Sequence, residues 1–325
     1  MTASWRDLDF GVTCIDAGYV EPGIACFYLL GRDDEYAVIE TGTSHSIAAL
    51  EQCLGEKGIS DQQLRYVIPT HVHLDHAGGA GTIMARFPSA QLLVHPRGAR
   101  HLIDPGRLVE SSIQVYGEQA FHRMYGEITP VPVERVQKMA DGDSVTLGNS
   151  VLEFRHTRGH ADHHFCVWDA LSQGWFSGDM FGISYSFLRF TGGNFVLPAT
   201  TPTQFNPALF AQSVELLAQY QPKRMYLTHY GELPYDSKVK QLLLEQVASY
   251  QALASQYAQD HEALKSAVLD CTLDALRPLL SDDDANAYRD RLNMDADLNA
   301  QGLTIWWQKH VAALSQESAQ KAKVQ

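Results

Sequence analysis

Short apolar runs alternate with helical patterns along the first 235 residues of the chain. Runs typical of strands lie at residues 26–30 (CFYLL), 36–40 (YAVIE), 65–69 (RYVIP) and 91–96 (QLLVHP). Ile47, Leu50 and Leu54 recur at helical spacing after the second run, and a helix of small residues is predicted over 80–87. The stretch from 96 to 132 is irregular and is expected to be loosely helical.

The same alternation continues further along this region. Runs typical of strands lie at residues 144–147, 150–157, 165–168, 174–177 and 225–228. Gly148 and Asn149 join the first two runs, as expected for a two-residue hairpin turn. Asn206 followed by Pro207 predicts the start of a helix. Strands, hairpins and helices in this mixture predict a layered α/β (α+β) domain over residues 1–235.

The amino-acid composition changes after residue 236. Leu, Ala, Gln and Glu dominate there, and no strand pattern remains. We therefore expect a helical C-terminal extension of three or four helices over 236–325. Ser281 and Asp284 have the spacing of a helix capping box. An apolar stripe that predicts a packed helix face runs through Leu303, Trp306, Trp307, His310 and Leu314.

The net charge of the chain indicates which kinds of molecule it can bind. The 325 residues include 25 basic and 38 acidic side chains, for a formal charge of −13. This charge repels polyanions, so we expect a small-molecule substrate rather than nucleic acid or an anionic membrane. The five cysteines are scattered and form no CxxC pair, and the N-terminus carries Arg6, Asp7 and Asp9 where a secretory signal needs an apolar core. These features predict a soluble, cytoplasmic protein.

Metal chemistry is indicated by the string HVHLDH at residues 71–76, which follows a predicted strand directly. Imidazoles and a carboxylate within six positions suit Zn²⁺, Fe or Mn²⁺, and the lack of thiolates nearby argues against a zinc finger. The alternative is a chance surface cluster. Three later polar residues, His160, Asp179 and His229, also follow predicted strands. Each alone would be typical of a hydrogen-bonded buried residue, but together they could complete two metal sites.

Five motifs, in this order, resemble those of the metallo-β-lactamase-fold superfamily, and within it the hydrolases around glyoxalase II and the zinc lactonases. They are VIETG (38–42), THVHLDHAGG (70–79), TRGH (157–160), SGD (177–179) and LTH (227–229). The resemblance covers about residues 20–232. It implies a four-layer αβ/βα sandwich with metals at one edge of the sheets.

The resemblance also implies the site. It assigns one ion to His71, His73 and His160, a second to Asp75, His76 and His229, and a bridging role to Asp179. The cofactors would be two divalent ions, Zn²⁺ first, with Fe or Mn²⁺ also compatible. A hydroxide held by the ions would be the nucleophile, and Asp75 and Asp179 are the expected catalytic carboxylates.

Several residues near these motifs depart from the family pattern or have open roles. Glu40 stands where family members usually have aspartate, and we expect it to support the metal loop through hydrogen bonds. His164 is expected to support the ligands as well, although His163 and His164 could equally be ordinary strand residues. Tyr185 and Arg189 are weak candidates for substrate binding, with packing against the helical extension as the alternative.

The leading hypothesis is a dinuclear metal-dependent hydrolase that cleaves an ester-like bond, with a thioester or lactone favoured. Asp179 disfavours a true β-lactamase, which lacks this bridging carboxylate. The first alternative is a persulfide dioxygenase with a single iron on His71, His160 and Asp179. The second is a regulator that keeps the metals and binds a ligand without turnover. Dimerisation through the helical extension is left open by the sequence.

Overall fold

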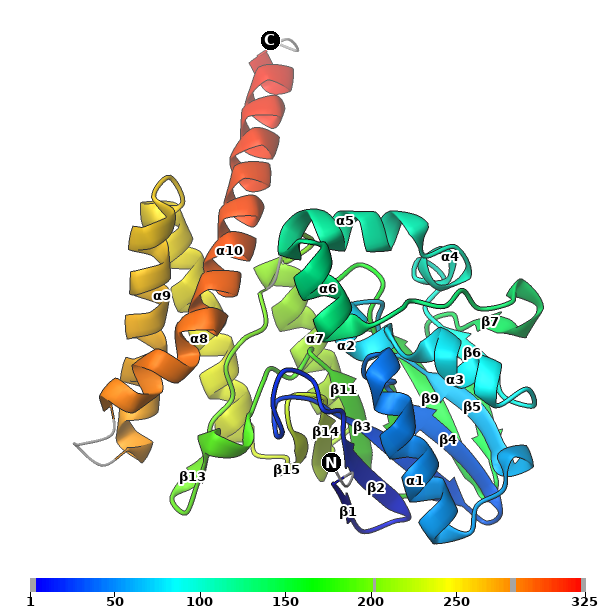
Figure 1. Cartoon of the computed structure of the whole chain (residues 1–325). Helices are drawn as coiled ribbons and strands as arrows, with labels where there is room; N and C mark the ends of the chain where they lie inside the picture. The colour runs from blue at the N-terminus through cyan, green and yellow to red at the C-terminus, as the bar shows by residue number, and fades with distance from the viewer. Residues whose placement is uncertain (1–3, 201–202, 281–284, 323–325) are drawn as a thin grey trace.

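Two β-sheets packed face to face, with helices on both outer faces, form the core of the molecule (Figure 1). The computed structural model describes residues 4–200, 203–280 and 285–322. The predicted capping box at Ser281 and Asp284 lies outside these residues. The architecture is the four-layer αβ/βα sandwich implied by the sequence motifs, with further helices after it.

The first sheet has seven strands in sequential order. Its first four strands are antiparallel neighbours, and the last four are parallel neighbours. The strands are β1 (Trp5–Asp7), β2 (Val12–Asp16), β3 (Cys26–Arg32), β4 (Glu35–Ile39), β5 (Leu64–Ile68), β6 (Gln91–Val94) and β7 (Val136–Lys138).

The second sheet has six strands in the order β15-β14-β11-β10-β9-β8. All neighbours are antiparallel except β11 and β14, which run parallel. The strands are β8 (Ser144–Leu147), β9 (Ser150–His156), β10 (Phe165–Asp169), β11 (Gly174–Gly178), β14 (Arg224–Leu227) and β15 (Gly231–Pro234). A separate small hairpin consists of β12 (Arg189–Phe190) and β13 (Gly193–Asn194).

Helices occupy the connections and the C-terminal region. The α-helices are α1 (Ile47–Lys57), α2 (Leu74–Ala77), α3 (Ala80–Arg86), α4 (Ala99–Ile103), α5 (Gly106–Tyr116), α6 (Glu118–Tyr125), α7 (Pro207–Gln219), α8 (Ser237–Tyr257), α9 (His261–Leu276) and α10 (Ala285–Ala322). Short 3-10 turns lie at Ser44–Ser46, Asp61–Gln63, Val133–Arg135, Ser186–Leu188 and Arg277–Leu279. Within the described residues, no helix combines the length and apolar character needed to cross a bilayer.

Alternation along the strands separates three layers of apolar packing. In β4, Ala37 and Ile39 face the second sheet, whereas Val38 faces α1 and α3 on the outside. Strand β3 does the same with five successive apolar residues, because both of its faces are buried. This burial explains why the run CFYLL is continuously apolar rather than alternating.

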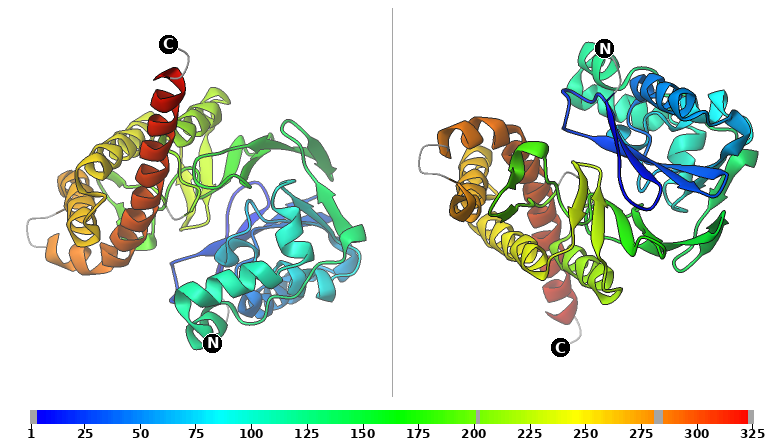
Figure 2. Two further views of the ribbon diagram at one scale, coloured as in Figure 1. Left: turned by 90° about the horizontal axis from the view of Figure 1, so that it is seen from above. Right: turned by 90° about the horizontal axis from the view of Figure 1, so that it is seen from below.

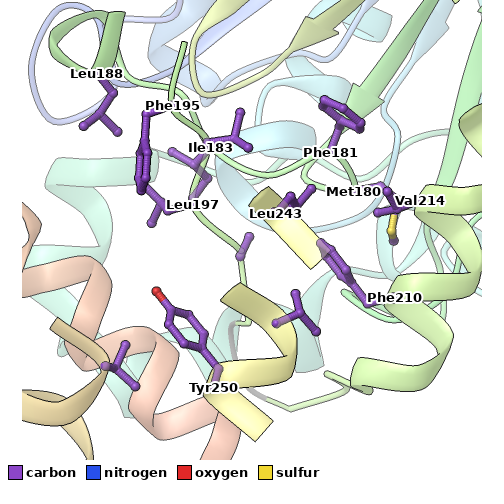
Figure 3. Packing of buried hydrophobic residues seen from close by; sticks show 14 of the residues in the cluster. Met180, Phe181, Ile183, Leu188, Phe195, Leu197, Phe210, Val214, Leu243 and Tyr250 are labelled. Atoms are coloured by element: carbon purple, nitrogen blue, oxygen red, sulfur yellow. The ribbon is translucent and has the colours of Figure 1, made fainter. Parts of the chain in front are cut away.

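The third apolar layer lies between the second sheet and the C-terminal helices. Segment 180–197 packs there against α7 and α8, with Phe210 of α7 and Leu243 and Tyr250 of α8 in the contact (Figure 3). Helices α9 and α10 add Leu264, Leu303 and others to the same layer. Helix α10 is long and its C-terminal end projects beyond the neighbouring helices (Figures 1 and 2).

The predicted strands are all present, within a few residues of their expected ends. The two-residue strands β12 and β13 were not expected, and neither were β1, β2, β7 and β15 of the two large sheets. Of the latter four, three have three or four residues, too few to show a period of two, and β2 (VTCID) is mixed in character. The irregular stretch 96–132 contains α4, α5 and α6, which agrees with the loosely helical expectation.

Candidate metal centre

The polar residues of the sequence motifs meet at one edge of the sandwich, where several strands end. Glu40 follows β4, and the string 71–76 follows the neighbouring parallel strand β5 and includes the start of α2. His160 follows β9, Asp179 follows β11, and His229 lies two residues after β14. The strands β9, β11 and β14 point the same way in the second sheet, so their ends share one edge.

One group of possible ligands consists of three imidazoles and a carboxylate. The Nε2 atom of His71 lies 2.8 Å from Nδ1 of His73, which lies 3.1 Å from Nε2 of His160. The Oδ2 atom of Asp179 is 3.4 Å from Nε2 of His160. These four side chains can each offer a ligand atom within 4.8 Å of the others.

A second group lies on the other side of the same carboxylate. Asp75 Oδ2 is 3.6 Å from His76 Nε2 and 3.3 Å from His229 Nε2. The Oδ1 atom of Asp179 lies 3.3 Å from His76 Nε2 and 3.6 Å from His229 Nε2. Asp179 therefore turns one oxygen toward each group.

The spacing of these atoms fits tetrahedral metal coordination. Zn²⁺ binds imidazole nitrogen at about 2.0–2.1 Å, which places tetrahedral ligand atoms about 3.3 Å from one another. The observed separations scatter around that value. In addition, His76 Nε2 and Asp179 Oδ1 are buried and lie 3.3 Å apart, and neither makes a well-aligned hydrogen bond. A buried polar atom without a partner is costly, and a metal ion between the two would satisfy both.

Glu40 joins the two halves of the centre from behind. Its carboxylate accepts hydrogen bonds from the Thr70 amide (3.0 Å), the Thr70 hydroxyl (2.6 Å), the Thr228 hydroxyl (3.0 Å) and Nδ1 of His76 (3.0 Å). Glu40 is buried and its backbone has a φ of +62°. The Glu40 carboxylate thus contacts the loops after β5 and β14, and its role toward bound metal stays a prediction.

Two further imidazoles, those of His160 and His229, are oriented by backbone carbonyls. Nδ1 of His160 lies 2.9 Å from the carbonyl oxygen of Ala199, and Nδ1 of His229 lies 2.8 Å from that of Ile24. An Nδ1–H donated to these carbonyls leaves the lone pair of Nε2 directed at the centre, which is the tautomer a metal ligand requires.

Two glycines allow the close approach of the loops. Gly178 has a φ of +51°, and a Cβ there would lie 2.4 Å from Oγ1 of Thr70 and 2.6 Å from Nε2 of His164. A Cβ on Gly79 would lie 2.6 Å from the carbonyl oxygen of Thr41. A larger residue at Gly178 would push the loops of the two sheets apart, and one at Gly79 would collide with the loop after β4.

Charge and burial set the protonation states. Burial lowers the pKa of His71 and His73 well below the usual range, and repulsion from neighbouring imidazoles adds to the effect. Although burial opposes it, the pKa of Asp179 is held well below its usual value by the imidazoles around it. The first group therefore presents the neutral imidazoles of His71 and His73 and the ionised carboxylate of Asp179, which are the forms that bind metal ions.

The imidazoles of the second group are protonated more readily than those of the first group. Burial opposes the charged form of His76 and His229, but the carboxylates of Asp179 and Asp75 outweigh it. They raise the pKa of His76 well above its usual value and that of His229 to about 9. Metal binding at this group must therefore displace protons.

The other predicted residues lie around the centre with different partners. His164 is buried, contacts Oγ1 of Thr157 through Nδ1 (2.8 Å), and its ring centroid is 4.9 Å from that of His71. Tyr185 lies near the ring of His229 (6.2 Å between centroids) and donates its hydroxyl to Asp295 of α10 (2.9 Å). The roles of these residues toward ligands or substrate stay predictions.

Arg189 is occupied by the backbone of the second sheet. Its guanidinium donates to the carbonyl oxygens of Tyr230 and Glu232, on and beside β15. Tyr185 and Arg189 thus both contact protein groups, Tyr185 on the helical extension. A substrate-binding role for either stays a prediction.

Some residues of the centre were missed by sequence reasoning. Thr70 and Thr228 each precede a ligand candidate, and the repeated Thr-His pair was a signal available in the sequence. Asp295 could not be found in this way, because it lies in a helix far along the chain. Burial raises the pKa of Asp295 to about 6, and its carboxylate accepts the hydrogen bond of the Tyr185 hydroxyl.

Comparison with known proteins gives the family. The family model described as "Metallo-beta-lactamase superfamily" matches residues 21–229. A metallo-beta-lactamase fold-containing protein of Sulfurisphaera tokodaii is 26% identical over 226 residues, which is 68% of this chain and 78% of that protein. A hydroxyacylglutathione hydrolase of Cupriavidus metallidurans is 30% identical over 130 residues, but this covers only 38% of the chain and 37% of that enzyme.

Solved structures agree on the fold. An archaeal metallo-beta-lactamase superfamily protein from Sulfolobus tokodaii matches with a TM-score of 0.64 and 23% identity, covering 90% of this chain and 98% of that one. A metallo-beta-lactamase family protein from Thermus thermophilus matches with a TM-score of 0.59 and 19% identity, covering 88% and 94%.

Proposed function

Because the chain belongs to the metallo-beta-lactamase superfamily, whose members are mostly hydrolases, we propose that it is a dinuclear metal-dependent hydrolase acting on an ester-like bond. The observation that carries the proposal is the position of Asp179 between two groups of imidazole and carboxylate side chains. The buried, unpartnered Nε2 of His76 and Oδ1 of Asp179 support metal binding there.

In this proposal His71, His73 and His160 would hold one ion, and Asp75, His76 and His229 the second. Bound divalent ions supply a water molecule of lowered pKa and polarise a carbonyl oxygen. The protein contributes fixed geometry, because carbonyl oxygens and Glu40 orient the imidazoles. Asp75 is the more open of the two carboxylates, with 20% of its side chain exposed against 7% for Asp179.

A thioester or lactone is the proposed substrate class. The partial match to a hydroxyacylglutathione hydrolase supports an acyl group carried on a thiol, and the C-terminal helices lie beside the centre through Asp295 and Tyr185. Zn²⁺ is the proposed metal, with Fe or Mn²⁺ compatible. The five unpaired cysteines agree with a reducing compartment, and a cytoplasmic location stays part of the proposal.

The test combines metal analysis with substrates. Purified protein is assayed for bound metal and for chelator-sensitive hydrolysis of an ester, a thioester, a lactone and a phosphodiester. We expect about two ions per chain and hydrolysis of a thioester or lactone. One iron per chain with oxygen uptake on glutathione persulfide would replace the proposal by a dioxygenase, and full metal loading without turnover would replace it by a regulator.

The variant Asp179→Asn tests the shared carboxylate directly. We expect loss of at least one ion per chain and a fall in turnover of about 100-fold or more, because the amide carries no charge and offers only one oxygen. Asp290→Asn makes the same chemical change on an exposed residue of α10 and should leave both quantities unchanged. An Asp179→Asn protein with unaltered metal content and turnover would show that the assignment is wrong.

A further inference from the structure

A pocket of about 450 Å³ opens beside the metal centre and carries an excess of basic groups. Its polar lining comes from three loops and the start of α4. The residues concerned are Arg97, Arg100, His101, Asp162, His163 and Gln204. The pocket lies outside the two groups of ligand candidates, and none of the sequence motifs includes its arginines.

One imidazole separates this pocket from the metal centre. The ring centroid of His163 lies 5.7 Å from that of His73 and 6.1 Å from that of His71, and on its other side 6.1 Å from that of His101. The loop that carries the arginines also packs on the metal string, because a Cβ on Gly98 would meet Val72 at 2.9 Å. The pocket therefore adjoins the first group of ligand candidates, with the ring of His163 between them.

The charges of the pocket are not balanced by its own carboxylate. Asp162 is held by Arg158, whose guanidinium donates to Oδ1 at 2.6 and 2.8 Å, while Arg97 is more distant at 3.4 Å from Oδ2. Arg100 has no carboxylate within ion-pair distance among the described residues. Local positive charge here contrasts with the formal charge of −13 of the whole chain.

A buried polar atom also lacks a partner at this place. His163 is only 8% exposed, and its Nδ1 atom has no hydrogen-bond partner. Two guanidinium groups and imidazole nitrogens are the donors that proteins use for carboxylates and phosphates.

We propose that this pocket binds an anionic group, a carboxylate or a phosphate, of the substrate whose scissile bond lies at the metals, with Arg97 and Arg100 as the main contacts. This inference rests on the proposed hydrolase function. The expected substrate is an anion. A few bonds would separate its charged group from the bond that is cleaved.

The test compares two esters that differ only in a distal charge, the 4-nitrophenyl monoester of adipic acid and 4-nitrophenyl hexanoate. Holoprotein should prefer the charged ester in kcat/KM. In Arg100→Gln and in the double variant with Arg97→Gln, the ratio of charged to neutral kcat/KM should fall about 10- to 100-fold, through KM, because a charge-assisted contact is lost. Arg107→Gln, an exposed residue of α5 with the same loss of charge, should leave the ratio unchanged.

A binding measurement keeps this inference separate from the hydrolase proposal. Calorimetry with inorganic phosphate and with succinate should show binding that weakens about 10-fold or more in Arg100→Gln but not in Arg107→Gln. The ligand that loses more affinity identifies the preferred group. If neither ester is cleaved but this difference is present, the hydrolase proposal fails and the anion site stands. Equal affinities in all three proteins, or an unchanged ester ratio, would overturn the anion site.

Discussion

Glu40 has an uncommon backbone conformation, and its carboxylate accepts four hydrogen bonds. A non-glycine residue at a φ of +62° is strained, and such strain persists where surrounding contacts hold it. Here the carboxylate connects the loop after β5 with the loop after β14 through Thr70, Thr228 and His76. Its function is therefore to align groups from both sheets.

Replacing the acid by its amide tests this alignment. In Glu40→Gln one acceptor oxygen becomes a donor, so at least one of the four contacts is lost and the imidazole of His76 loses its charged partner. We expect metal affinity to fall about 10- to 100-fold, measured by competition with a chromogenic chelator. Glu56→Gln, an exposed residue of α1, is the matched control. Equal affinities in the two variants would contradict the role given to Glu40.

Protonation of His229 makes metal binding dependent on pH. In the metal-free protein its pKa is about 9, so the ring is charged at pH 7 and must lose a proton to become a ligand. His76 behaves in the same way. We expect release of about two protons per chain at pH 7 and an apparent affinity that rises with pH up to about 9. Calorimetry in two buffers of different ionisation enthalpy measures the release, and its absence at pH 7 would argue against this ligand assignment.

At the scale of elements, an ion pair connects the two sheets. Arg32 ends β3 and Asp169 ends β10, their side chains are 2% and 0% exposed, and Arg32 donates directly to Asp169. Ser150 adds a hydrogen bond of 3.0 Å to the same carboxylate. Each of these buried charges is stable there only beside the other, so the pair favours the arrangement of the sheets that brings them together.

Breaking this pair should cost much more than breaking an exposed one. In Asp169→Asn the Arg32 charge stays buried without its partner, and we expect the free energy of unfolding to fall by about 3–5 kcal/mol in urea denaturation. The exposed pair Arg277–Asp274, at 76% and 70% exposure, provides the control. Asp274→Asn should change stability by less than about 1 kcal/mol. Similar losses of unfolding free energy in both variants would mean that the buried pair stabilises the fold no more than the exposed pair does.

Helix α10 influences the centre through the segment that it covers. Asn299 of α10 accepts hydrogen bonds of 2.8 Å from both the amide and the hydroxyl of Thr200. The preceding residue, Ala199, contributes the carbonyl that orients His160. Helix α10 therefore holds Thr200, the neighbour of the residue that orients His160. It also contacts Tyr185 through Asp295.

At the scale of the whole molecule, metal ions would join the two sheets at their common edge. The ligand candidates come from loops of both sheets, so ions that bind only the folded chain should stabilise it. At a metal concentration about 1,000 times Kd the gain is about 4 kcal/mol. We expect chelation to lower the melting temperature and Zn²⁺ to restore it, measured by differential scanning calorimetry. Identical melting curves before and after complete metal removal would contradict this.

Much of the site could be predicted from the sequence because its chemistry is local. Four ligand candidates occupy residues 71–76, and the others follow predicted strands within one to four residues. Apolar runs were long enough to predict the central strands of both sheets. Edge strands such as β1 and β7 have three residues each, and their pairing partners, rather than their own pattern, make them strands.

The amino-acid sequence by itself determined the ligand types, their order along the chain and the layered α/β class, because these depend on residue identity and on short-range periodicity. Only the tertiary structure decided that Asp179 turns one oxygen to each group of ligand candidates, that Asp295 of α10 reaches Tyr185, and that Arg97 and Arg100 line a pocket beside the centre. These contacts join residues far apart in the chain, and their distances follow from how the sheets and helices pack.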